Sequence, residues 1–211
     1  MSLASDARFW DRTSRKYARS AISDQAGYER TVERTRTLLR SGDRVLELGC
    51  GTGTTALRLA GDVRDYLATD VSTGMIAIAN EKHAVAPIPS LAFRAATAEA
   101  IAPEAAPFDA ALGFNYLHLV RDLPGTLRTI HGLLAAEGLF ISKTPCIGDM
   151  NPLLRLALPP MRAIGVAPYA GVFRATMLVQ HIRAAGFDIL AMETHATKGN
   201  DNRPYIAARK K

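Results

Sequence analysis

The stretch VLELGCGTGTTALRLAG, from Val45 to Gly61, decides the fold of this chain. It begins with a short apolar run, continues through a loop with glycine at three alternate positions, and ends in a helical pattern of alanine and leucine. Glycine has no Cβ atom, so its backbone can adopt positive φ and approach a ligand closely. A strand, a glycine loop and a helix in this order predict a ligand cradle in an open α/β sheet.

The segments around this stretch alternate between strand-like and helix-like patterns. The two last strands have no helix between them, which predicts a hairpin. The pattern predicts an α/β, Rossmann-like, doubly wound fold, whose seven-stranded sheet is mostly parallel with one antiparallel strand near the C-terminus and helices on both faces. We expect strands at residues 45–48, 65–70, 91–97, 108–115, 138–145, 187–196 and 203–209. We expect helices at residues 54–60, after Ser72, after Asp122 and before Gly186.

The composition favours one intracellular domain. The chain has 211 residues, of which 48% are hydrophobic and 22% charged, so we expect a single domain over residues 1–211. It has no apolar run long enough for a membrane span. Its two cysteines, Cys50 and Cys146, fit a reducing, cytoplasmic compartment better than a disulfide framework. We expect a monomer or a homodimer.

The net charge of +6 is concentrated at the two ends of the chain, while the middle is slightly acidic. Excess positive charge can favour nucleic acid, anionic lipid or acidic substrates. The sequence has no basic stripe interleaved with aromatic residues and no block of five like charges. Solvated faces therefore explain the excess better, and we expect no nucleic-acid partner.

Two known types of nucleotide-binding loop are alternative explanations for the glycine stretch. A dinucleotide loop has the spacing G-x-G-x-x-G, but here Gly53 falls one place early and Thr54 stands at the third glycine position. A P-loop is excluded because no Gly-Lys-Ser/Thr follows. Asp70 lies 21 residues after Gly49, where a carboxylate can accept hydrogen bonds from ribose hydroxyls. The alternative for Asp70 is a cap on the helix that begins near Ser72.

On these residues, VLELGCGTG resembles motif I of the class I S-adenosylmethionine-dependent methyltransferases, in their small-molecule branch. The resemblance implies that S-adenosyl-L-methionine is the cofactor and S-adenosyl-L-homocysteine the product. It also implies that the loop wraps the methionine end of the cofactor and that Asp70 binds the ribose. The residues implied for cofactor binding are Tyr17, Glu47, Gly49, Gly51, Gly53, Asp70, Val71, Met75, Thr97, Ala98 and Asn115.

The resemblance also shows one position that departs from the family pattern and one segment that resembles the family's N-terminal cap. Thr97 stands where family members often carry an aspartate that contacts the adenine amino group, and the Ala98 amide can serve the ring instead. Asn115 matches the position that approaches the transferred methyl group. Residues 1–42 resemble the N-terminal helical cap segment of this branch, in which a tyrosine such as Tyr17 folds over the cofactor carboxylate.

Methyl transfer from a sulfonium requires alignment, desolvation and, for some acceptors, removal of a proton. Tyr116 and His118 follow the fourth predicted strand, and His118 is the candidate general base. The alternative for His118 is a packed or solvent-facing side chain. Cys146 as a nucleophile is a minor alternative to a buried structural thiol. No group of ligand residues has metal-binding spacing, so we expect no metal.

Residues 148–173 form a connection far longer than the roughly 2 to 6 residues that such connections usually have. They contain four prolines and many leucine, methionine and isoleucine residues, which predicts a lid-like insertion of short helices over an apolar acceptor pocket. The alternatives are a dimer contact or added core. The candidates for lining the pocket are Leu153, Leu154, Leu156, Met161 and Tyr169.

These features predict an enzyme that transfers a methyl group from S-adenosylmethionine to a small or medium organic acceptor of partly hydrophobic character. The alternatives are an RNA or protein methyltransferase and a catalytically silent S-adenosylmethionine-binding protein.

Overall fold

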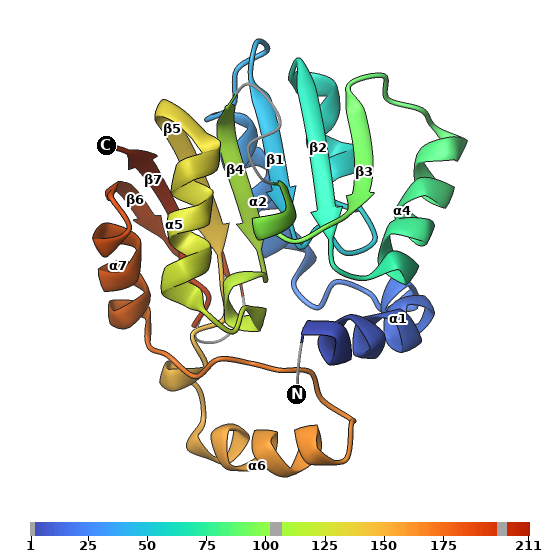
Figure 1. Ribbon diagram of the computed structural model, residues 1–211, viewed down its shortest axis with the longest axis vertical. Helices are drawn as coiled ribbons and strands as arrows, with labels where there is room; N and C mark the ends of the chain where they lie inside the picture. Colours follow the sequence, from blue (N-terminus) through green and yellow to red (C-terminus); the bar gives the residue numbers. More distant parts are fainter. Residues whose placement is uncertain (1–2, 102–106, 198–201) are drawn as a thin grey trace.

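The computed structural model describes residues 3–101, 107–197 and 202–211. Its centre is a seven-stranded sheet in the order β3-β2-β1-β4-β5-β7-β6 (Figure 1). Neighbouring strands from β3 to β5 pair in parallel, and β7 is antiparallel to both β5 and β6. The predicted fold with one reversed strand is confirmed. The strands are β1 Arg44–Leu48, β2 Asp65–Asp70, β3 Leu91–Ala95, β4 Phe108–Phe114, β5 Leu134–Lys143, β6 Phe187–Glu193 and β7 Tyr205–Lys210.

Helices cover both faces of the sheet (Figure 1). Val32 of α2, Leu59 of α3 and Ile76 of α4 are buried on one face. Leu127 of α5 and Ile182 of α7 are buried on the other. The α-helices are α1 Leu3–Arg19, α2 Gln25–Arg36, α3 Ala56–Leu59, α4 Thr73–Val85, α5 Leu123–Leu133, α6 Pro152–Ala163 and α7 Ala175–Ala184. Short 3-10 turns follow several elements: η1 Ala60–Asp62, η2 Glu99–Ile101, η3 Leu117–Leu119 and η4 Ile147–Asp149.

Two predicted helix starts are confirmed by their caps. Ser72 Oγ accepts a hydrogen bond from the Met75 backbone N at 3.1 Å, and Asp122 Oδ1 accepts one from the Gly125 N at 2.9 Å. These bonds satisfy backbone donors that have no partner within the helix. The start of β5 differs from the prediction, because the strand begins at Leu134 rather than near residue 138. A buried leucine at that position satisfies the apolar pattern of a helix and of a strand equally.

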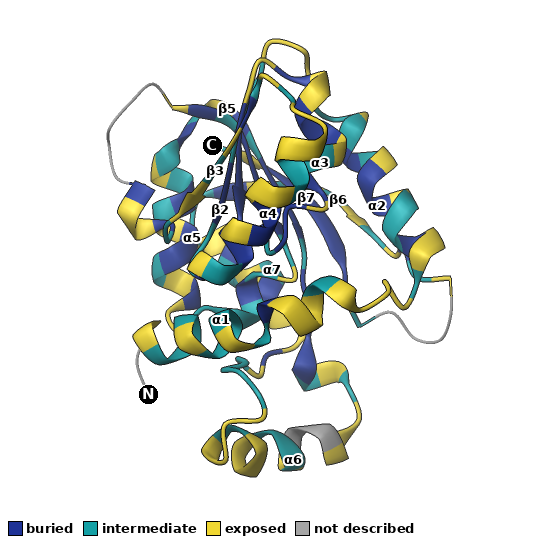
Figure 2. Ribbon diagram, turned by 90° about the vertical axis from the view of Figure 1, so that its right-hand side faces the viewer, coloured by how far each residue is buried: buried dark blue, intermediate teal, exposed yellow. Residues whose placement is uncertain are grey.

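The carboxyl ends of β1 to β4 point toward α1 (Figure 1). The strand order reverses between β1 and β4, which is where open α/β sheets bind ligands. The insertion helix α6 lies beyond α1 at the same end of the molecule, and none of its described side chains is buried (Figure 2). No helix in the described part of the chain is long and apolar enough to cross a membrane.

Candidate active site

The glycines of the loop between β1 and α3 have different surroundings. A Cβ atom on Gly53 would lie 2.6 Å from Phe93 Cζ, so packing against β3 requires glycine there. A Cβ atom on Gly51 would have Tyr17 Cε1, at 3.8 Å, as its nearest neighbour, so Gly51 borders open space. Their backbone angles are all left-handed, with φ of 69° at Gly49, 55° at Gly51 and 75° at Gly53. Gly51 is therefore the glycine whose backbone a ligand can approach.

Asp70, at the end of β2, holds the glycine loop in place. Its Oδ2 accepts a hydrogen bond from the Gly51 N at 3.0 Å, and its Oδ1 accepts one from the Ser72 N at 2.8 Å. Burial raises the pKa of Asp70, and the backbone hydrogen bonds oppose that rise. Each carboxylate oxygen can accept a second hydrogen bond. The cap of α4 is Ser72, so Asp70 keeps capacity for a ligand beside the loop.

A cavity of about 560 Å³, here called the α1 cavity, lies between α1 and the carboxyl ends of β1 to β4. Its size is typical of cofactor and substrate sites. Glu47 lines a second cavity instead, and Gly53 faces Phe93. The other predicted site residues all line the α1 cavity: Tyr17, Gly49, Gly51, Asp70, Val71, Met75, Thr97, Ala98, Asn115, Tyr116 and His118.

The second cavity, of about 630 Å³ and here called the α2 cavity, lies between the glycine loop, α2 and the end of β5. It shares Gly51 and Asn115 with the α1 cavity, so a ligand on the loop can contact both. Lys143 Nζ donates a hydrogen bond to Thr31 Oγ1 at 3.2 Å on its wall. Sequence patterns do not indicate Lys143 and Thr31, because only the folded sheet brings the end of β5 beside α2. The one available signal is a lysine at the end of an apolar strand.

Asn115 and Thr97 occupy turns at the ends of β4 and β3. Asn115 has a φ of 51°, a left-handed conformation that asparagine tolerates better than most residues. Its backbone N donates to the Lys143 carbonyl oxygen at 2.7 Å, which fixes the turn beside both cavities. Thr97 Oγ1 accepts a hydrogen bond from the Ala100 N at 3.2 Å. The Thr97 hydroxyl proton therefore stays available to a ligand in the α1 cavity.

His118 and Tyr116 form part of the wall of the α1 cavity after β4. His118 Nδ1 is buried and has no hydrogen-bond partner in the structure. Burial, together with the positive charge of Arg203, lowers the pKa of His118 to about 4. The imidazole is therefore neutral near pH 7. The Tyr116 ring packs against the Cα side of Gly49, and burial raises the pKa of Tyr116, which stays protonated.

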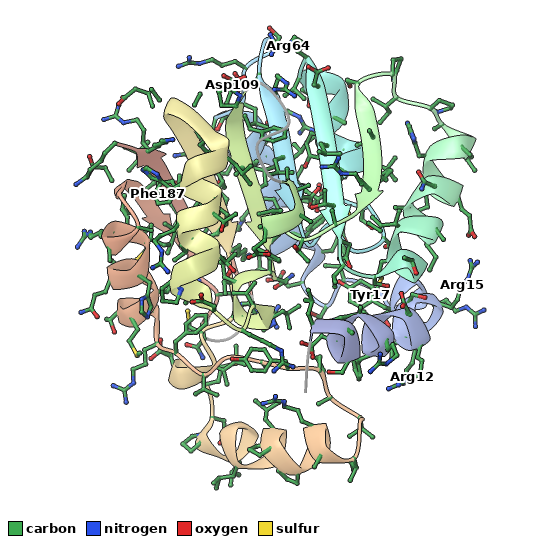
Figure 3. All side chains as sticks on the ribbon, viewed as in Figure 1. Arg12, Arg15, Tyr17, Arg64, Asp109 and Phe187 are labelled. Atoms are coloured by element: carbon green, nitrogen blue, oxygen red, sulfur yellow. The ribbon has the colours of Figure 1, made fainter. Side chains whose placement is uncertain are left out.

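Two sets of hydrogen bonds hold helix α1 over the α1 cavity. Asp11 Oδ1 accepts hydrogen bonds from the Gly74 N at 2.9 Å and from Ser72 Oγ at 2.7 Å, at the start of α4. Asp6 accepts two hydrogen bonds from the Arg121 guanidinium, at 2.8 and 2.9 Å. Figure 3 shows Tyr17 on the side of α1 that faces the sheet. The N-terminal segment thus covers the glycine loop and places Tyr17 beside it.

Known proteins resemble this chain in sequence over part of its length and in fold over most of it. A family model described as a methyltransferase domain matches residues 45–138, which include the glycine loop, Asp70 and Asn115. The magnesium protoporphyrin IX methyltransferase of Synechocystis PCC 6803, solved with bound S-adenosylhomocysteine, shares the fold with a TM-score of 0.71 and 16% identity, over 98% of this chain and 95% of that one. Residues 45–138 thus resemble a methyltransferase domain in sequence, and the whole chain shares the fold of a solved methyltransferase. The cofactor that this resemblance implies is S-adenosylmethionine.

Two curated relatives of this chain have names that describe different reactions. The mitochondrial arginine-hydroxylase NDUFAF5 of Danio rerio is 27% identical over 194 residues, which are 86% of this chain and 59% of that protein. The ubiquinone biosynthesis O-methyltransferase of Methylocella silvestris is 36% identical over 103 residues, which are 49% of this chain and 40% of that protein. The chain thus spans between 40% and 59% of the length of these two relatives.

The residues around the loop fit this cationic cofactor. Glu47 is buried beneath the loop, and the Tyr66 hydroxyl donates a hydrogen bond to its Oε2 at 2.9 Å. Burial raises the pKa of Glu47 to about 7, while the Tyr66 hydrogen bond opposes the rise and the negative charge of Asp70 adds to it. S-adenosylmethionine carries a sulfonium and an ammonium group. A cation beside Glu47 and Asp70 would favour their ionised forms.

The raised pKa of Glu47 predicts a pH-dependent stability. Between about pH 4.5 and pH 7, folded Glu47 holds a proton that the unfolded chain has lost. The free energy of unfolding should therefore fall as the pH rises through this window, by about 3 kcal/mol at most. Glu47→Gln keeps an acceptor for Tyr66 and should remove the fall. Urea unfolding of both proteins below and above the window measures it, and an equal fall in the variant would assign the effect to another group.

The two thiols are buried and unreactive. Cys146 Sγ lies 3.6 Å from the Thr144 carbonyl oxygen, and burial raises the pKa of Cys146 to about 12. Burial also raises the pKa of Cys50. This argues against the nucleophilic cysteine considered above, because the thiolate is the reactive form. We expect iodoacetamide to modify neither cysteine in the folded protein and both in denaturant, as read by mass spectrometry. Rapid labelling of folded Cys146 would contradict this.

Among the described residues, no three His, Cys, Asp or Glu side chains form a group that could hold a metal ion.

Proposed function

We propose that the methyltransferase moves the methyl group of S-adenosylmethionine to a small or medium organic acceptor with an apolar body, and releases S-adenosylhomocysteine. The main support is the buried Nδ1 of His118, which has no hydrogen-bond partner and lies in the same cavity as Gly51 and Asp70. An unpaired buried polar atom costs free energy, so a polar ligand group that pairs with it gains affinity. Leu119 and Val120 line the same cavity and favour an acceptor that is otherwise apolar.

The chain's part in the reaction is mainly positional. When bound, the cofactor supplies a methyl group on a positively charged sulfur, which leaves as a neutral thioether when the acceptor's lone pair attacks in line. Gly51 would contact the methionine part of the donor and Asp70 its ribose, and Asn115, at the wall shared by the two cavities, would lie near the transferred methyl group. His118 Nδ1 receives the proton of the methylated acceptor. Methylation makes that proton acidic, so a weak base suffices.

We also propose that residues 148–173 act as a lid over the α1 cavity. The Tyr169 ring lies between the guanidinium groups of Arg121 and Arg162, whose Cζ atoms are 4.6 and 4.7 Å from its centroid. The Gly171 N donates to the His118 carbonyl oxygen at 2.7 Å. These contacts join the insertion to the cavity wall and, through Arg121, to α1. They support Tyr169 as the residue that links lid and site.

The residues of the insertion expected to line the acceptor pocket lie elsewhere, and Tyr169 is absent from both cavity walls as well. Leu153, Leu156 and Met161 are exposed on α6 and contribute to neither cavity wall. The side chain of Leu154 is outside the described residues. The apolar composition of the insertion pointed to burial, but the sequence could not indicate that α6 turns these residues away from the sheet.

A product-release screen tests the proposed reaction. We expect S-adenosylhomocysteine to form with an apolar small molecule that carries a hydroxyl, amine, thiol or carboxyl group. With that acceptor, His118→Leu should lower kcat by about a hundredfold, the usual size of a lost general base, and leave the cofactor dissociation constant unchanged. Arg128→Gln, an exposed change on α5, is the control.

Three outcomes of the screen would contradict the proposal. Turnover with RNA or protein alone would favour a macromolecular acceptor. Cofactor binding without turnover on any acceptor would favour a catalytically silent binding protein. Full turnover in His118→Leu would remove His118 from the reaction, whichever acceptor is used.

A further inference from the structure

We infer that the end of the molecule formed by α1 and α6 docks on an anionic lipid surface. Here an exposed apolar patch from the insertion lies next to an exposed basic face of α1. The proposal concerns where the protein binds and does not depend on the reaction proposed above.

The apolar patch consists of four side chains within fourteen residues of the insertion. Their exposed fractions are 70% for Leu153, 73% for Leu156, 75% for Ile164 and 57% for Val166. A soluble protein rarely gathers large exposed apolar side chains without an interaction partner. Other exposed apolar side chains, such as Val85 at the end of α4 and Leu190 on β6, stand apart from this patch.

The basic face belongs to α1. Arg8, Arg12, Lys16 and Arg19 are exposed and are spaced by four, four and three residues, which places them on one side of a helix. None of these four forms an ion pair with another described residue, whereas Arg15 beside them pairs with Glu81. The opposite side of α1 carries Trp10 and Tyr17 into the α1 cavity. Helix α1 therefore has a basic outer face and a ligand-facing inner face.

The two features adjoin each other. Arg12 Nη2 lies 4.0 Å from the position of a Cβ atom on Gly165, directly between Ile164 and Val166. Figure 3 shows Arg12 on the side of α1 toward α6, and Figure 2 shows α6 next to α1 at the end of the molecule. Apolar side chains that insert among acyl chains thus stand beside cations that can meet headgroup phosphates.

The combination favours lipid over a second copy of the chain. A symmetric dimer through this surface would bring the basic faces of two α1 helices into one interface, and the net charge of +6 adds to that repulsion. An anionic membrane surface attracts each of these residues and accepts the apolar patch. Charge complementarity therefore identifies the occupant as an anionic lipid surface.

Vesicle co-sedimentation tests the docking surface. We expect the protein to sediment with vesicles of equal parts phosphatidylcholine and phosphatidylglycerol, and much less with phosphatidylcholine alone. Arg8→Gln, Arg12→Gln and Lys16→Gln together should lower the partition coefficient by about a hundredfold, and added salt should weaken wild-type binding. Leu153→Gln with Leu156→Gln should lower it by about tenfold.

Matched changes elsewhere control for hydrophobicity and charge. Val85→Gln with Leu190→Gln, and Arg128→Gln with Arg183→Gln, change exposed residues away from the surface and should bind vesicles as wild type does. Unchanged melting temperature and cofactor affinity would show that the docking variants remain folded. Three results would overturn the inference: no binding of wild type to anionic vesicles, equal binding of docking and control variants, or a dimer in sedimentation velocity that Leu153→Gln with Leu156→Gln dissociates.

Discussion

Gly51→Val should abolish cofactor binding while the protein still folds. The Cβ position of Gly51 has free space around it, with Tyr17 Cε1 at 3.8 Å, so the new side chain would occupy the place of the ligand. The φ of 55° adds a strain of about 1 to 2 kcal/mol for a residue other than glycine. We expect the dissociation constant of S-adenosylmethionine to rise by at least roughly a hundredfold, about 3 kcal/mol. Isothermal titration calorimetry measures this change.

Gly53→Val is the matched comparison, because it sits in the same loop with a similar φ. Its Cβ atom would lie 2.6 Å from Phe93 Cζ, inside the core beneath the loop. Overpacking of this kind costs about 1 to 3 kcal/mol of stability, so this variant should melt at a lower temperature than Gly51→Val. Cofactor affinity retained in Gly51→Val would contradict the assignment of the loop as the cofactor cradle.

Asp70→Ala should weaken cofactor binding and loosen the loop together. The carboxylate accepts hydrogen bonds from the Gly51 N and the Ser72 N, and Asp70 lines the α1 cavity. Loss of charge-assisted hydrogen bonds to ribose hydroxyls costs about 1 to 3 kcal/mol. The two backbone donors would also lose their acceptor. We therefore expect the dissociation constant to rise by roughly ten- to a hundredfold, with a lower melting temperature.

Asp70→Asn separates the two roles of Asp70. Its amide oxygen can still accept one backbone hydrogen bond, and the loss of a buried charge offsets part of the damage to stability. We expect its melting temperature to lie closer to wild type than that of Asp70→Ala, while calorimetry still finds weaker cofactor binding. An unchanged dissociation constant in both variants would leave Asp70 with a purely structural role at the loop.

Most of the site residues at the carboxyl ends of the parallel strands could be predicted from local sequence. The glycine loop, Asp70 and Asn115 each follow a recognisable apolar strand, and parallel strands bring their carboxyl ends to one edge of the sheet. The caps Ser72 and Asp122 are equally local, because each bonds a backbone N three residues ahead. Local patterns therefore sufficed where the structure depends on neighbours in the chain.

Contacts between distant segments could not be predicted. Lys143 reaches Thr31 only after β5 takes its place beside β4, and the pairing of Tyr66 with Glu47 depends on the register of β1 and β2. Tyr169 stands between Arg121 and Arg162 because the insertion folds back onto the cavity wall. No periodicity of the sequence carries that information.

The exposed leucines of α6 are the largest difference between the predicted and the observed burial. Leucine-rich segments with a helical pattern usually bury one face, yet Leu153 and Leu156 lie in solvent. The composition of a segment shows how apolar it is, but it does not show whether the segment packs against the protein or faces solvent.

Calorimetric titration with S-adenosylmethionine and, separately, with NAD tests the central claim most directly. Three features predict a site for a cationic adenosine sulfonium: the glycine spacing, the open space beside the Cα atom of Gly51, and the two acidic residues Glu47 and Asp70. We expect saturable one-to-one binding of S-adenosylmethionine, lost in Gly51→Val, and no binding of NAD. Preferential binding of NAD, or no binding of S-adenosylmethionine, would contradict the account.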